Sequence, residues 1–190
     1  MGNESIGKSN VGRIAERIVA NELEYRGFRV SDLNKEGVSA NADLLAVKGG
    51  KGWQIQVKGA SFDINYSSGW WFSYGYCNEE IIRNPDLSMF NRSKSFYQAE
   101  IVVSVCVKRP NEYHCLILPV EKAEKAAQMN LNYAYRTKKK DGTDKKPNKV
   151  WVGFRFVPNT PDEQKRLRMV DEQNFLEPFI DNWDFDAPER

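Results

Sequence analysis

Apolar residues follow two different spacings along this chain, and the first of them predicts a helix. Over roughly residues 11–26 they recur at the spacing of one broad helix face, formed by Val11, Ile14, Ala15, Ile18, Val19 and Leu23. Ser9 or Asn10 is expected to cap the start of this helix, and Gly27 is expected to end it.

After residue 27 the spacing changes to the alternation of β-strands. Strands are expected at about 28–33, 43–48, 53–59, 70–76, 99–108, 112–120 and 149–157, with a tight turn of glycines near residue 50. Helical spacing returns at about 121–134 and 161–173, and the tail after Phe175 is expected to pack irregularly through Phe179 and Trp183. Helices placed before, between and after strands predict an α/β fold, and we expect one domain over residues 1–190.

The strand QIQVKGA, residues 54–60, carries an unusual polar face. Side chains two apart share one face of a strand, so Gln54, Gln56 and Lys58 point one way and the apolar set of Trp53, Ile55 and Val57 points the other. Two interpretations stay open: the polar face of an antiparallel strand lies in water, or this face lines a site.

Composition narrows the class of protein. The chain has 190 residues, 41% hydrophobic and 28% charged, which is ordinary for a globular domain. It contains no apolar run of about 18 residues that would span a membrane. Its N-terminus, MGNESIGKSN, has no apolar core of a signal peptide, so we expect a cytoplasmic protein.

Cysteine and histidine usage disfavours several kinds of site. The three cysteines form no CxxC pair, which makes a zinc or iron–sulfur site built on cysteines alone unexpected. The single histidine, His114, excludes zinc sites that need two. A histidine-dependent nucleophilic triad would need this residue, which lies in a strand-like run.

Charge is unevenly distributed although the net charge is only +2. The segment 136–149 is strongly basic and the tail 171–190 is acidic. The basic segment is either a solvated loop or a surface that neutralises phosphates. In the second case its contacts with nucleic acid would come from Lys138, Lys139, Lys140, Lys145 and Lys146.

Polar groups converge at one end of the predicted hairpin. If the hairpin closes near residues 49–51, paired positions sum to about 100, and Asp43 falls across from about position 57, near Gln56 and Lys58. An aspartate that opens an otherwise apolar strand needs a partner. A simple salt bridge with Lys58 is one explanation and a shared site is the other.

Four stretches in this order resemble the PD-(D/E)xK nuclease superfamily, which has the restriction-endonuclease-like fold and includes archaeal Holliday junction resolvases. They are GRIAER at 12–17, GFRV at 27–30, ADLLA at 42–46 and QIQVK at 54–58. The resemblance covers roughly residues 10–60 and continues weakly to 120. It implies a mixed β-sheet flanked by helices.

Site residues follow from the resemblance position by position. It implies that Glu16, Asp43, Gln56 and Lys58 are catalytic, and that Mg²⁺, or Mn²⁺ as a substitute, is held by Asp43, Gln56, Glu16 and the carbonyl of Val57. Gln54 is expected to contact nucleic acid, and Glu22 is a rival for the role of Glu16. The superfamily usually has an acidic residue at the position of Gln56. A glutamine there resembles a variation found in some homing endonucleases, and it lowers the negative charge of the site.

The resemblance implies a DNA endonuclease, in a superfamily that serves restriction, repair and mobile elements. Cutting both strands of a duplex suggests a homodimer or a larger homo-oligomer. Two alternatives remain: a nuclease fold that only binds nucleic acid, and a protein-interaction module that uses the aromatic stretch WWFSYGY at 70–76.

Overall fold

The computed structural model describes residues 8–34, 42–61, 70–77, 99–109, 111–136, 142–143, 150–156 and 170–185. Its elements, in chain order, are α1 (Lys8–Tyr25), β1 (Arg29–Asp32), β2 (Leu44–Lys48), β3 (Lys51–Ser61), β4 (Trp70–Cys77), β5 (Ile101–Arg109), β6 (Glu112–Pro119), α4 (Val120–Arg136), β7 (Val150–Phe156), α6 (Val170–Leu176) and the 3₁₀ turn η2 (Glu177–Phe179).

Five strands form one mixed sheet in the order β1-β2-β3-β5-β6. β3 and β5 are parallel, and the other neighbours are antiparallel. β4 and β7 form a separate antiparallel pair. The fold is therefore the α/β fold with a mixed sheet and flanking helices that the sequence predicts, and β3 lies inside the sheet.

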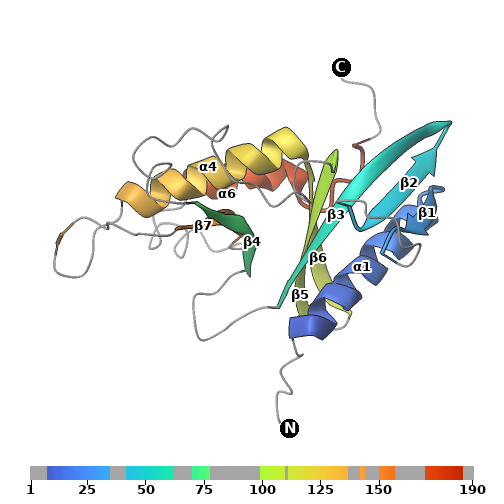
Figure 1. The fold of residues 1–190 in the computed structure, drawn as a ribbon, viewed down its shortest axis with the longest axis horizontal. Coiled ribbons are helices and arrows are strands. Elements are labelled where there is room, and N and C mark those ends of the chain that lie inside the picture. Colours follow the sequence, from blue (N-terminus) through green and yellow to red (C-terminus); the bar gives the residue numbers. More distant parts are fainter. Residues whose placement is uncertain are drawn as a thin grey trace, which may run out of the picture.

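Helices cover both faces of the five-stranded sheet (Figure 1). α1 packs on one face, over a core that includes Val11, Ala15, Val19, Ile55, Val57, Val103 and Val105. The β4–β7 pair, α4 and α6 lie on the other face, over a core that includes Trp70, Phe72, Val102, Leu116, Leu118, Ala126, Phe156 and Leu176. Trp70 and Phe72 of the aromatic stretch are thus core residues, and their burial leaves them no role in contacting another protein.

α1 starts earlier than its apolar pattern indicates. It begins at Lys8, so Ser9 and Asn10 lie within it and the expected N-cap is wrong. The first turn is polar and precedes Val11, which is buried, so it carries no hydrophobic signal. The predicted end is confirmed, because Gly27 has φ 83° and the Phe28 N–H donates to the Leu23 carbonyl at 3.1 Å.

The hairpin of β2 and β3 closes with two glycines. Gly49 and Gly50 have φ of 61° and 81°, which is the requirement of a type I′ turn. Lys48 pairs with Lys51 and Leu44 with Ile55, so paired positions sum to 99 rather than 100. The register is one residue from the prediction because the turn is 49–50 alone.

The C-terminal segment packs along the sheet as an irregular strap. Asp181 donates its N–H to the Cys115 carbonyl at 2.7 Å, and its Oδ1 accepts the Cys115 N–H at 2.7 Å. Trp183 is buried, and Phe185 stacks on Phe28 with ring centroids 5.5 Å apart. The predicted anchor at Trp183 is confirmed, and the predicted start of the last helix at residue 161 lies outside the described residues.

Candidate active site

Asp43 lies immediately before β2 and is held by its backbone from two sides. Its N–H donates to the Ile55 carbonyl at 2.9 Å, and its carbonyl accepts the Leu33 N–H at 3.0 Å. Its Oδ2 accepts the N–H of Val57 at 2.7 Å. The carboxylate is therefore fixed beside β3, one residue before the start of β2 at Leu44.

The carbonyl of Val57 faces the same place. In a strand the N–H and C=O of one residue point to the same neighbour, and both the Ile55 carbonyl and the Val57 N–H point toward the chain at Asp43. β2 begins at Leu44, opposite Ile55, so it does not extend to Val57. A backbone carbonyl and a carboxylate thus lie together at the end of β2.

Gln56 and Lys58 share the face of β3 away from α1, as predicted. Trp53, Ile55 and Val57 belong to the core under α1, so the even-numbered side chains lie on the opposite face. Gln56 has only 3% of its surface exposed, and Lys58 is half-buried. The interpretation of this face as a strand surface in water is therefore wrong at Gln56, although Gln54 is exposed.

The regular register ends where Leu44 pairs with Ile55. Asp43 then contacts both neighbours of Gln56, because its N–H donates to the Ile55 carbonyl and its carboxylate accepts the Val57 N–H, close to the predicted position 57. Within the described part of the chain, the Asp43 carboxylate binds N–H donors and forms no ion pair with Lys58. The partners of the Asp43 carboxylate are therefore N–H donors, and the simple salt bridge with Lys58 is wrong.

α1 crosses β3 directly beside these residues, at Gly59. A Cβ built on Gly59 would lie 2.8 Å from the Ala15 Cβ and 2.8 Å from the Val11 carbonyl oxygen. The glycine therefore lets the helix backbone approach the strand closely. Glu16 follows Ala15 in α1 and is half-buried.

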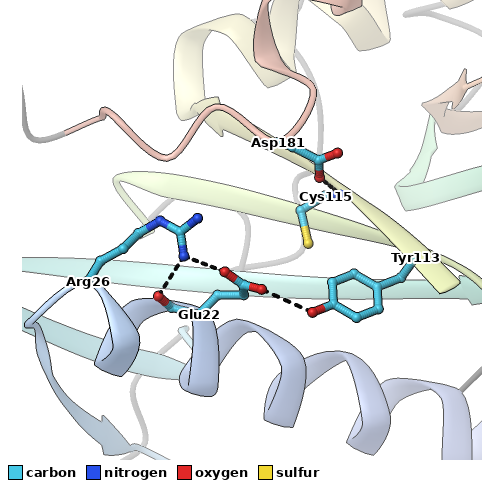
Figure 2. Close-up of polar contacts among 5 residues, drawn as sticks. All are labelled: Glu22, Arg26, Tyr113, Cys115 and Asp181. Carbon is cyan, nitrogen blue, oxygen red and sulfur yellow. Dashed lines mark hydrogen bonds and ion pairs between the residues drawn. The ribbon is translucent and has the colours of Figure 1, made fainter. Parts of the chain in front are cut away.

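Glu22, the rival of Glu16, points to another part of the sheet (Figure 2). Its Oε1 accepts the hydroxyl of Tyr113 on β6 at 3.0 Å, and its Oε2 forms an ion pair with Arg26. Burial raises the pKa of Tyr113 from its ordinary 10.0 to about 12, and the hydrogen bond to Glu22 adds to the shift. Both carboxylate oxygens of Glu22 are thus engaged away from Asp43.

The direction of Glu22 also locates Glu16. Six residues of helix rotate by about 600°, so the two side chains leave α1 roughly 120° apart. Glu22 reaches β6 at one edge of the sheet, and β2 and β1 lie at the other. Val19, midway between the two glutamates, is fully buried under α1. Glu16 and Glu22 therefore leave the helix on opposite flanks, and Glu16 lies on the flank nearer to β2.

Sequence reasoning missed one residue beside the carboxylate. Asn34 donates from Nδ2 to Asp43 Oδ1 at 3.3 Å, and its own N–H donates to Asp32 Oδ1 at 3.1 Å. The only sequence signal was an asparagine directly after a strand, which is common in turns.

The oxygen atoms at the end of β2 suit a hard divalent cation. Mg²⁺ is usually held by one or two carboxylates and keeps several waters. Asp43 supplies a carboxylate, Val57 a carbonyl and Gln56 an amide oxygen. Among the residues that the structure describes, no group of three or more His, Cys, Asp and Glu side chains could hold a metal ion by itself.

Five predicted nucleic-acid contacts fall outside the described residues: Lys138, Lys139, Lys140, Lys145 and Lys146. Over the ranges that are described, no helix is long and apolar enough to cross a membrane.

Comparison with solved structures places this fold beside that of a nuclease. The chain is similar to the bacterial homing endonuclease I-Ssp6803I, with a TM-score of 0.53 over 95% of this chain and 93% of that chain. The two sequences are 12% identical, so the likeness is one of fold. No protein-family model and no curated protein matches the sequence.

Proposed function

We propose that this protein is a metal-dependent DNA endonuclease that hydrolyses phosphodiester bonds through a PD-(D/E)xK-type site. The observation that carries the proposal is the Asp43 carboxylate, held 2.7 Å from the Val57 N–H at the end of β2. Gln56 and Lys58 follow on one face of the same strand. The fold likeness to a homing endonuclease supports DNA as the substrate.

Asp43, Gln56 and the Val57 carbonyl would hold Mg²⁺ or Mn²⁺, and Glu16 would complete the set from α1. When bound, the metal polarises the scissile phosphate and lowers the pKa of a coordinated water. Lys58 orients the attacking water and neutralises charge that develops on the phosphate. Gln54, exposed on the same face, would contact the substrate strand.

Gln56 fits this role because it is buried. A carboxylate with 3% exposure would be costly to keep ionised without a cation, whereas an amide needs only hydrogen bonds. The neutral side chain therefore tolerates a metal-free state that a glutamate at this position would not.

The substrate form is tested by incubating the purified protein with supercoiled plasmid and with nicked, branched and single-stranded DNA, in Mg²⁺ or in EDTA. We expect cleavage of at least one form in Mg²⁺ and none in EDTA. Cleavage that persists in EDTA would contradict the metal dependence.

A second candidate, a nuclease fold that binds nucleic acid without cutting it, is favoured by Gln56. It predicts retention of DNA at low salt with no product in Mg²⁺ or Mn²⁺ on any of the four substrates. This outcome would replace the endonuclease by the binding protein. If the endonuclease cuts duplexes, we also propose a homodimer or a larger homo-oligomer, which gives one site to each strand.

A further inference from the structure

The turn after β1 holds the carboxylate of Asp43 from the side opposite β3. Asn34 donates from its side-chain amide to Asp43 Oδ1 at 3.3 Å. The position of Asn34 is itself set, because its backbone N–H donates to Asp32 Oδ1 at 3.1 Å. The neighbouring Leu33 N–H donates to the Asp43 carbonyl at 3.0 Å. Three consecutive residues at the end of β1 thus take part in placing Asp43.

Both oxygens of the Asp43 carboxylate therefore have an N–H donor, and the two donors come from different elements. Oδ2 accepts from Val57 on β3, and Oδ1 accepts from Asn34 beyond β1. A carboxylate oxygen has two acceptor positions, so each retains one for a cation. Two donors on opposite sides fix the rotation of the carboxyl group, which a single donor would leave free.

We propose that Asn34, anchored by Asp32, is a positioning residue that sets the Asp43 carboxylate for a divalent cation. This inference rests on the proposed function. It assigns Asn34 no contact with the metal or the DNA. Residues that orient metal ligands act through the ligand, and their removal weakens metal binding by about 10- to 100-fold. Because Asn34 is exposed and its hydrogen bond to Asp43 is long, the lower end of this range is expected.

The test compares wild type, Asn34→Ala and a matched control, Asn174→Ala. Asn174 is also an exposed asparagine but lies on α6, on the other side of the sheet. Mn²⁺ binding is measured by calorimetry on the full chain without DNA, and the melting temperature is measured in EDTA. We expect Asn34→Ala to bind Mn²⁺ about tenfold more weakly, and the control to bind like wild type. The melting temperature in EDTA should change by no more than about 2 °C in either variant.

A second readout separates positioning from chemistry. The Mg²⁺ concentration for half-maximal DNA cleavage should rise about tenfold in Asn34→Ala, while the rate at saturating Mg²⁺ stays close to that of wild type. A lower rate at saturating Mg²⁺ with unchanged half-saturation would overturn the positioning role.

Other outcomes are also decisive. Equal Mn²⁺ affinity of wild type and Asn34→Ala would overturn the inference and leave the proposed function standing. Weaker binding together with a melting temperature lower by more than about 5 °C would make Asn34 a folding residue instead. If wild type itself neither binds Mn²⁺ nor cuts DNA, the proposed function fails first.

Discussion

Asp43 shows how much of the candidate site depends on single residues. Its N–H and carboxylate bind β3, and its carbonyl binds Leu33. Its place beside residues 55–57 of β3 could be predicted from the sequence, because a turn of two glycines between alternating strands limits the hairpin register to within one residue. The hydrogen bond with Asn34 could not, since it joins residues nine positions apart whose intervening sequence is polar and has no hydrophobic periodicity.

The substitution Gln56→Glu tests whether the buried position 56 needs a neutral side chain when no metal is bound. The added carboxylate is buried, so we expect the metal-free variant to lose stability, by about 1–3 kcal/mol. A divalent cation beside the new charge should recover most of the loss, because binding to the folded state alone stabilises it. Thermal unfolding with and without Mn²⁺ measures both effects. Equal stabilisation of wild type and variant by Mn²⁺ would place the cation away from residue 56.

The raised pKa of Tyr113 predicts how the stability of the fold depends on pH. Its folded pKa of about 12 is above its ordinary 10.0, so its neutral form is stabilised by folding. That stability is fully present below pH 10 and is lost as the pH rises through the folded pKa. Urea unfolding of wild type and Tyr113→Phe at about pH 9 and about pH 11 should show a steeper fall for wild type. Parallel behaviour of the two proteins would contradict the shift and its source in burial and Glu22.

Among the elements, the crossing of α1 over β3 links the fold to the site. Gly59, one residue after Lys58, is where the helix lies on the strand. The sequence predicted both elements from their periodicity, but not the crossing point. The crossing point of a helix on a strand depends on where both surfaces carry small residues, here Ala15 and Gly59. Hydrophobic periodicity does not predict the positions of such small residues.

Gly59→Ala should displace α1 and with it Glu16. The new Cβ would meet the Ala15 Cβ and the Val11 carbonyl at 2.8 Å, so the helix must shift, at a cost of about 1–3 kcal/mol. For a chain of this size that corresponds to a melting temperature lower by roughly 2–10 °C. Gly52→Ala is the matched control, because its Cβ meets only the Leu45 and Val47 side chains, at 3.6 and 3.7 Å. Equal melting temperatures of the two variants would contradict the close crossing.

Across the whole molecule, the sheet separates two cores, and the proposed site lies at an end of β2 between them. α1 and the C-terminal strap cover one face, and α4, α6 and the β4–β7 pair cover the other. Alternation and helical spacing predicted the mixed α/β fold. They did not predict that β4 leaves the main sheet to pair with β7, because long-range pairing is not encoded in local pattern.

The basic segment 136–149 is proposed to hold a polyanion near the acidic metal ligands. Replacing Lys138, Lys139 and Lys140 together with Ala should weaken DNA binding about equally for all sequences. The slope of log affinity against log salt should become shallower by up to about 0.9 for each phosphate that these lysines neutralise in wild type. Binding titrations at several salt concentrations measure this slope, and an unchanged slope would remove these lysines from the interface.

The most direct test of a metal-dependent nuclease site is the single-turnover rate of DNA cleavage by Asp43→Asn in Mg²⁺. Asparagine keeps an oxygen that can accept the Val57 N–H, so the substitution removes the charge with little effect on the fold. Asn174→Ala, purified in the same way, controls for the effect of a surface substitution on the rate, and a contaminating nuclease would cut equally in all three preparations. We predict that wild type and the control cut DNA equally, and that Asp43→Asn is slower by a factor on the order of 100 or more at an unchanged melting temperature. Cleavage by Asp43→Asn at the wild-type rate would contradict the site.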